Sequence, residues 1–328
     1  MASKAADFAP IRFSTDHLPE RERLPMWREQ FGRGVVRVDI EPLSDRPFHA
    51  EATLRALPGL RTIACKGSAA RLQRTPAMAA EGDDSVGLVV NLGKRAVATQ
   101  RGRELVLGAG DAVLFLTHEP AGLTSTSHLG MLFPRAALAA RVSDIDDASM
   151  RLMPHGTQSL QLLVNYMSAV HDNLALDTRK LRRTVVSHIH DLAALVVGPE
   201  RALGEAGLTA VSAARLQVAL RHIGESFHEP DLTVAAIARR QQVSPRYLQR
   251  LLETTGMSFT ARVNELRMQR AFALLTEAHQ RRISDVALQS GFSDISHFNR
   301  LFRTRFGDTP RGTRARLKRT AAQGPSAD

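Results

Sequence analysis

The sequence predicts an α+β protein with an N-terminal β-sandwich or small barrel and a C-terminal domain made only of helices. Three observations support this. Short apolar runs separated by turn residues fill residues 35–133. Helical periodicity takes over from Pro134. A pattern of two short helices then occurs twice in the last third of the chain.

Size and composition favour two domains with ordinary packed cores. The chain has 328 residues, of which 43% are hydrophobic. Its single cysteine, Cys65, excludes an intramolecular disulfide and a multi-cysteine zinc site, and it fits a reducing compartment. Because we find no signal-peptide core and no run of membrane-spanning length, we expect a cytoplasmic protein with no membrane partner.

The positive charge is concentrated in the last third of the chain. The whole sequence has 44 Lys and Arg against 33 Asp and Glu. Residues 211–328 hold 19 of those cations and 10 of the acids, which leaves 25 and 23 for residues 1–210. A net charge of +9 in the C-terminal part predicts a polyanionic partner there, with nucleic acid favoured over a membrane surface.

The strands are expected within residues 35–133. Residues 105–120 read as a hairpin with Gly108, Gly110 and Asp111 in its turn. The predicted strands are VVRVDI (35–40), LRTIAC (60–65), VGLVVNL (86–92), AVATQ (96–100), ELVLG (104–108) and AVLFL (112–116).

Two amphipathic helices follow the strands. Pro134 is expected near the first position of a short helix, and Asp177-Thr178 supplies the turn and N-cap between the two longer ones. Their apolar stripes either pack within the domain or form a dimer seam. The stripes are Leu160, Leu163, Val164, Met167, Val170 and Leu174, then Leu181, Val185, Ile189, Leu192 and Val196.

The resulting domain division places residues 1–200 in the first domain, with strands at about 35–133 and helices at about 134–198. Residues 201–213 are expected to be a linker, because the sequence there has few large apolar residues. Residues 214–320 form the helical domain, and residues 321–328 a disordered tail.

The helical domain contains one pattern twice, over about residues 232–256 and 283–307, at an offset of 49 or 50 residues. Each copy is a short helix, a turn anchored by an apolar residue, and a second helix with an N-cap. The cap is Ser244 in the first copy and Ser293 or Asp294 in the second. This is the geometry of a helix-turn-helix motif, whose second helix enters the major groove of DNA.

A helical wheel divides the second helix of each copy into an apolar stripe and a polar face. The stripes are Leu248, Leu251 and Leu252, then Ile295, Phe298, Leu301 and Phe302. Arginine pairs with guanine, Gln and Asn with adenine, and Ser with either. A merely solvated surface is disfavoured, because both copies present arginines at matching positions. The predicted base-reading residues are Arg246, Gln249, Arg250, Ser296, Asn299 and Arg300, with His297 as a further candidate.

A helix over about residues 258–278 joins the two copies. About 18 helical residues span about 27 Å, so one chain can place two recognition helices in adjacent major grooves, about 34 Å apart. Arg262, Arg267 and Arg270 on this helix make either phosphate contacts or internal salt bridges. The candidates for phosphate contacts are Ser244, Tyr247, Arg267, Arg270 and Arg303.

Residues 216–316 resemble the double helix-turn-helix domain of the AraC/XylS transcription regulators. The resemblance implies base reading at the positions that the wheel selects. The matching segments are Leu232-Thr233-Val234, Val243-Ser244-Pro245-Arg246-Tyr247-Leu248, Gly291-Phe292-Ser293-Asp294, Ser296-His297-Phe298, Arg300-Leu301-Phe302, Phe306-Gly307 and Thr309-Pro310.

The N-terminal part is similar to the sensor half of the same family, through Phe13-Ser14-Thr15, Arg23 and Trp27. That similarity implies a jelly-roll-like domain with dimerising helices. It also implies a small organic effector, contact with RNA polymerase, and a homodimer that activates transcription. No pocket residue is assigned, because one sequence does not determine the strand register.

The enzyme alternatives have little support. His49-Ala50-Glu51 has the spacing of a zinc deaminase, but the cysteine pair of that motif is absent. His188 and His190 fall on different faces of a helix and so cannot chelate one metal. We therefore expect no catalytic residue, metal or cofactor. The remaining alternatives to a ligand-responsive regulator are a sandwich enzyme with a DNA-binding appendage and an effector-independent architectural DNA binder.

Overall fold

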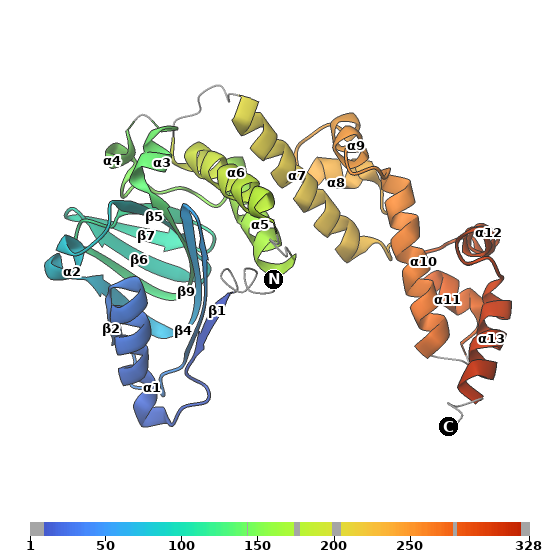
Figure 1. Cartoon of the computed structure of the whole chain (residues 1–328), viewed down its shortest axis with the longest axis horizontal. Helices are drawn as coiled ribbons and strands as arrows, with labels where there is room; N and C mark the ends of the chain where they lie inside the picture. The colour runs from blue at the N-terminus through green and yellow to red at the C-terminus, as the bar shows by residue number, and fades with distance from the viewer. Residues whose placement is uncertain (1–9, 143, 174–177, 199–204, 278–280, 323–328) are drawn as a thin grey trace. The chain divides into compact units, whose positions relative to one another are not determined.

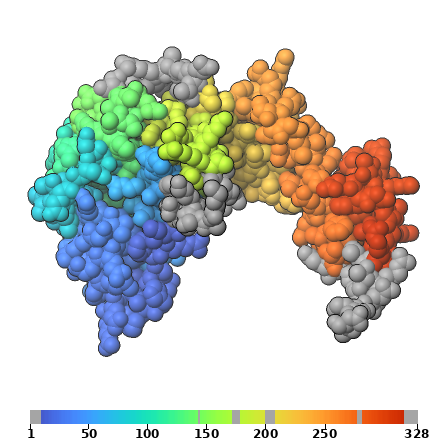
Figure 2. All heavy atoms as spheres, in the orientation of Figure 1, coloured from blue at the N-terminus to red at the C-terminus, as the bar shows by residue number. Residues whose placement is uncertain are grey.

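The computed structural model describes residues 10–142, 144–173, 178–198, 205–277 and 281–322 (Figure 1). The chain divides into two compact units, Met1–Ala214 and Arg215–Asp328. Figure 2 shows the outer surface of the described residues with all heavy atoms as spheres. Among the described helices, none combines the length and the apolar character needed to span a bilayer.

In the described residues of the first unit, nine strands form one antiparallel sheet. Its main order is β1-β3-β4-β9-β5-β8, while β2 pairs with β4, β6 pairs with β9, and β7 pairs with β6. The strands are β1 (Ile11–Ser14), β2 (Asp39–Pro42), β3 (Ala50–Leu57), β4 (Leu60–Arg74), β5 (Ser85–Asn91), β6 (Arg95–Gln100), β7 (Arg103–Gly108), β8 (Ala112–Leu116) and β9 (Ala121–Pro134).

The long strand β4 bends sharply in its middle. Its register with β9 shifts between Lys66 and Ala70, which marks a β-bulge. Gly67 lies inside this bulge, and a Cβ atom there would be 2.4 Å from the carbonyl oxygen of His49. The bend brings Arg61 and Arg74, from opposite ends of the strand, to one cavity.

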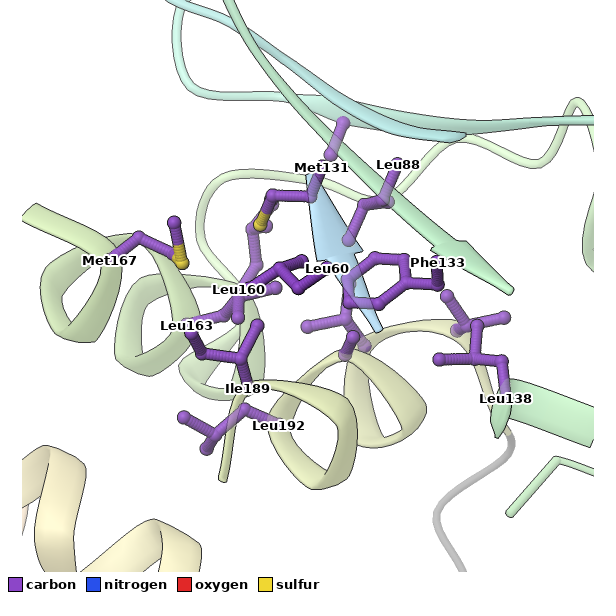
Figure 3. Packing of buried hydrophobic residues seen from close by; sticks show 14 of the residues in the cluster. Leu60, Leu88, Met131, Phe133, Leu138, Leu160, Leu163, Met167, Ile189 and Leu192 are labelled. Carbon is purple, nitrogen blue, oxygen red and sulfur yellow. The ribbon is translucent and has the colours of Figure 1, made fainter. Parts of the chain in front are cut away.

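Side-chain alternation gives the central strands two different faces. On one face, Leu88 of β5 pairs with Met131 of β9 and Leu114 of β8. This face packs against α5 (Gln158–Asn173) and α6 (Arg179–Val197), and Figure 3 shows Met131 in the same buried cluster as Leu163 and Ile189 of these helices. The opposite face carries Gly87 and Gly130 and borders a cavity.

The apolar stripes of α5 and α6 pack within the unit, as the first of the two alternatives predicted. The side chains that form this core are Leu160, Leu163, Met167, Val170, Val185, Ile189, Leu192 and Val196. Thr178 caps α6 by accepting a hydrogen bond from the Leu181 amide at 3.1 Å. Leu174 and Asp177 lie outside the described residues.

Two strand predictions were wrong. Val35 and Val36 belong to the π-helical segment η2 (Trp27–Val36), which follows α1 (Glu20–Met26), because Trp27 and Phe31 are buried on one side of it and stack at 4.3 Å. The hairpin over residues 105–120 does not form either. β7 pairs with β6, and β8 pairs with β5, so the turn at Gly108–Asp111 leads from one part of the sheet to another.

Much of the expected linker is helical. Residues 205–213 begin α7 (Glu205–Ser226). Ala210 and Ala214, one turn apart, are fully buried in the core of the first unit with Val211. Small side chains at this spacing allow a helix to pack closely, which explains why a segment with few large apolar residues is ordered. Residues 201–204 lie outside the described residues.

The second unit consists of helices around two small cores. Ile237, Leu248 and Leu252 are buried in the first core, and Val286, Phe298 and Phe302 in the second. Its remaining helices are α8 (Val234–Arg240), α9 (Pro245–Glu253), α10 (Phe259–Glu277), α11 (Ile283–Gln289), α12 (Ile295–Phe306) and α13 (Pro310–Ala322). Residues 321 and 322 thus end a helix, whereas 323–328 of the expected tail lie outside the described residues.

The short helices of the first unit are α2 (Pro76–Ala80), α3 (Arg135–Ala139) and α4 (Ile145–Ala148).

Two glycines of the second unit provide a matched test of close packing. Gly291 and Gly256 both have positive φ angles, 92° and 76°. A Cβ at Gly291 would lie 2.8–2.9 Å from the carbonyl oxygens of His228 and Phe227, whereas a Cβ at Gly256 would meet nothing within 4 Å. We expect Gly291→Ala to lower the free energy of unfolding by about 3 kcal/mol and Gly256→Ala by about 1 kcal/mol. Denaturant unfolding followed by circular dichroism measures both, and equal losses would contradict this packing.

Candidate nucleic-acid interface and ligand cavity

The two helix-turn-helix copies have the same turn. The amide of Val243 donates to the carbonyl of Ala238 at 3.0 Å, and the amide of Phe292 donates to that of Ala287 at the same distance. The preceding residue is left-handed in both copies, with φ at 53° for Gln242 and 92° for Gly291. In each of these three pairs, the residue of the second copy lies 49 residues after its counterpart in the first copy, which is the predicted offset.

Side-chain caps begin both recognition helices. The Ser244 hydroxyl accepts a hydrogen bond from the Tyr247 amide at 3.2 Å. In the second copy the cap is Asp294 rather than Ser293, and its carboxylate accepts from the amides of Ser296 and His297 at 2.7 and 3.1 Å. These backbone hydrogen bonds hold the pKa of Asp294 below its usual range.

The recognition helices α9 and α12 present their polar faces to solvent. Leu248 and Leu252 are buried under α9, and Phe298 and Phe302 under α12. Ile295, which the wheel placed on the buried stripe, is the first residue of α12 and is 46% exposed. The exposed candidates for base reading are Arg246, Gln249, Arg250, Ser296, Asn299 and Arg300.

His297 occupies a different position from the other base-reading candidates. Its side chain is half-buried, and its ring lies 6.2 Å from that of Phe292. Arg300 Nη2 is 3.0 Å from His297 Nδ1. This contact holds the guanidinium of Arg300 beside His297, and base reading by His297 stays a prediction.

The phosphate candidates fall into two groups. Ser244, Arg270 and Arg303 are exposed, and Tyr247 is half-buried with the Arg215 guanidinium 5.5 Å from its ring centroid. The Arg267 side chain instead donates hydrogen bonds to backbone carbonyls within the second unit. The role of all five in phosphate contact stays a prediction.

Arg267 joins the two helix-turn-helix copies. Its Nε donates to the Phe227 carbonyl and its Nη2 to that of Glu229, both at 2.7 Å, ahead of the first copy. Its guanidinium also lies 5.6 Å from the ring centroid of Phe292, in the second copy's turn. Burial lowers the pKa of Arg267. Of the two roles open to Arg267 in the sequence, the structure shows an internal one, with carbonyl oxygens in place of carboxylates.

Arg305 is a structural residue that sequence reasoning left unassigned. It forms a bidentate ion pair with Glu265 of α10, with both N–O distances at 2.9 Å. Hydrogen bonding between the two groups raises the pKa of Arg305 and lowers that of Glu265. The three arginines of α12 therefore divide their roles: Arg300 and Arg303 remain on the exposed face, and Arg305 fixes α12 to α10.

The first unit contains a cavity of about 430 Å³ on the face of the sheet opposite α5 and α6. Gly87 of β5 and Gly130 of β9 leave this face open, since a Cβ at Gly87 would meet no atom within 4 Å. His128 is buried at the cavity, and burial lowers its pKa to about 4, so the imidazole is neutral at pH 7. Glycine inside a strand was the available signal for this site.

The histidines considered as metal ligands have other partners. His49 Nδ1 lies 2.9 Å from the Ser68 hydroxyl. His188 pairs with the Tyr166 hydroxyl at 3.0 Å, and His190 Nε2 lies 2.8 Å from the Gly59 carbonyl oxygen. Within the described ranges, no three His, Cys, Asp or Glu side chains are grouped so that they could hold a metal ion.

Comparison with known proteins identifies the family. Residues 27–197 match the AraC-binding-like domain, and residues 237–316 match a helix-turn-helix domain. The chain belongs to the AraC family of transcriptional regulators. It is a DNA-binding protein of a transcription-factor family and not an enzyme.

Relatives cover nearly the whole of this AraC-family chain. It is 27% identical to the transcriptional activator NphR of Rhodococcus sp, over 92% of each chain. It is 23% identical to the transcriptional activator RhrA of Rhizobium meliloti, over 95% of this chain and 98% of that one. The crystal structure of the AraC-like activator CuxR has the same fold, with a TM-score of 0.51, 22% identity, and coverage of 86% of this chain and all of that one.

The exposed arginines of this AraC-family protein predict separable effects on affinity and specificity. We expect Arg250→Ala or Arg300→Ala to relax base preference at one subsite, because each good base contact contributes about 1–3 kcal/mol of discrimination. The fold should be retained, since both side chains are exposed. Competition binding on specific and random DNA measures this, with Arg311→Ala in α13 as a matched control. Equal losses on both DNAs would show that these arginines contact only phosphates.

Proposed function

We propose that this protein is an effector-responsive transcriptional activator that binds DNA as a homodimer. The observation that carries the proposal is the matched pair of recognition helices, each with exposed arginine and amide side chains beside a buried apolar stripe. In this proposal the base-reading set is Arg246, Gln249, Arg250, Ser296, Asn299 and Arg300, supported by His297.

The length of α10 supports the reading of two adjacent grooves by one chain. Its 19 residues span about 28 Å at 1.5 Å per residue. Successive major grooves on one side of DNA are separated by about 34 Å, and the recognition helices add their own width to the span. Each chain would then read two subsites about one helical turn apart.

Activation and effector sensing have separate support. Two relatives that match almost the whole chain are named as transcriptional activators, which favours productive contact with RNA polymerase over simple repression. The cavity of about 430 Å³ falls in the range of 300–1,000 Å³ usual for small-molecule sites. We infer that an effector bound there changes how the recognition helices are used, and that the protein acts in the cytoplasm with its DNA.

Selection of binding sites from random duplex DNA tests the proposal. The expected result is a consensus with two subsites about 10 base pairs apart for each chain, and repeated subsites for a dimer. Binding that enriches no sequence would instead support an architectural DNA binder. Binding should also weaken steeply with salt, because the second unit neutralises phosphates with many arginines.

Dimerisation provides a further prediction. We expect the full chain to sediment as a dimer and a fragment of residues 205–328 as a monomer, because the proposal assigns the dimer contacts to residues 1–200. The fragment should still bind DNA, with lower affinity, since it retains both recognition helices. Analytical ultracentrifugation measures both species, and a dimeric fragment would place the dimer contacts in the second unit.

A further inference from the structure

The cavity of the first unit has an apolar interior. Phe31 of η2, Ile63 of β4, and Phe115 of β8 line it, together with Leu132 of β9. On the sheet, Gly87 pairs with both Leu132 and Phe115, and Gly130 pairs with Ile63. Two successive rungs therefore have a glycine at their centre, which opens a trough between large apolar side chains.

The mouth of the cavity is charged, and its cations outnumber its anions. Arg37, Arg61 and Arg74 line the mouth with Glu81 and Asp83, so one positive charge remains unbalanced. Arg61 pairs with Asp83 at 2.8 Å. Arg74 Nη2 donates to the Val36 carbonyl at 2.8 Å, and Arg37 donates to the Glu81 carbonyl. Neutral carbonyl oxygens orient these two guanidiniums without balancing their charges.

The position of Arg74 is electrostatically unfavourable without a further anion. Its side chain is half-buried, and burial together with the charges of Arg37 and Arg61 lowers its pKa, while Asp83 acts in the opposite direction. A bound carboxylate would stabilise all three cations at once, and hydrogen bonds between guanidinium and carboxylate groups are among the strong ones.

His128 contributes a polar side chain to the cavity lining at a distance from Arg61. His128 pairs with Cys65 on the sheet, four residues along β4 from Arg61, which corresponds to about 13 Å. Its imidazole is buried and neutral at pH 7, so it can exchange a hydrogen bond with an uncharged polar group. A ligand that fills the trough is thus anionic at one end and apolar along its length.

We propose that this cavity binds an apolar organic acid, with the carboxylate between Arg61 and Arg74 and the hydrocarbon part between Phe31 and Phe115. This assignment rests on the proposed function, in which the cavity holds the effector, and it adds the chemical class of that effector. Neutral molecules and amines of the same shape are expected to bind poorly, because they leave the charge at the mouth unbalanced.

Titration calorimetry on the full chain tests the proposal with matched probes. Phenylacetate, 4-phenylbutyrate and 6-phenylhexanoate provide three lengths, and each is compared with its primary amide and with the amine of equal length. We expect at least one acid to bind, its amide to bind about tenfold or more weakly, and its amine not to bind, since a hydrogen bond to a charged group contributes about 1.5–3 kcal/mol.

Four variants locate the site. Arg74→Gln and Arg61→Gln should each weaken binding of the acid by about tenfold; Arg61 is exposed, so that variant keeps the test valid if Arg74→Gln fails to fold. Gly87→Leu should abolish binding, because its side chain enters the trough without a backbone clash. Arg71→Gln is the matched control: Arg71 lies on the same strand, pairs with Glu41 at 3.2 Å, and is expected to leave binding unchanged.

The possible outcomes separate the two proposals. If an amide or amine binds as well as its acid and Gly87→Leu abolishes that binding, the cavity is an effector site and the anionic class is wrong. If an acid binds and Gly87→Leu has no effect, the site lies elsewhere and this inference fails. If no acid, amide or amine binds the folded protein, the assignment of an organic acid fails together with the effector role of the cavity. A DNA-binding measurement on the same sample then tests separately whether the protein is a DNA-binding regulator.

Discussion

The alternation of side chains along β5 and β9 is the constraint on which the first unit depends. Leu88 and Met131 point to one face and are fully buried against helices, while Gly87 and Gly130 point to the other. A shift of one residue in this register would exchange the two faces. The hydrophobic core and the cavity would be lost together, so packing energy also holds the cavity in place.

The second unit depends on an equivalent constraint at a single turn. Gly291 adopts a φ of 92°, and the carbonyl oxygens of the segment before the first copy would lie 2.8–2.9 Å from any Cβ atom placed there. Gln242 adopts the same left-handed conformation in the first copy, where its side chain is exposed to solvent. A side chain is therefore tolerated at one copy of the turn, and only glycine fits without strain at the other.

Local patterns predicted the helical domain well because its helices are strongly amphipathic and its repeat is explicit. The caps at Ser244 and Asp294 follow directly from residue type. Strand pairing in the first unit was harder to predict, because β7 and β8 are adjacent in sequence but pair with different partners. Which strands meet is decided by non-local packing, and the cavity depends on that register.

Non-local contacts also limit how well the roles of individual side chains in α12 can be predicted from the sequence. The wheel separated Phe298 from Arg300 correctly, since that division needs only a period of 3.6 residues. It left Arg305 without a role, because the partner of Arg305 is Glu265, 40 residues earlier in the sequence. Nor did it place Ile295 outside the core, because the exposure of a first-turn residue depends on where neighbouring elements end.

The contacts of Arg267 inside the second unit affect how two helix-turn-helix motifs, each of low specificity alone, combine into one specific DNA-binding unit. When one recognition helix is bound, the second binds as an intramolecular event, and its effective concentration falls if the joint between them is loose. α10 alone fixes the axial separation of the two copies, but it does not fix their rotation about the helix axis. Arg267 restrains that rotation, because it holds the carbonyls of Phe227 and Glu229 on one side and the ring of Phe292 on the other. In the proposed function, an arginine with contacts inside the unit can thus raise specificity by keeping the arginines of α9 and α12 in a fixed relation.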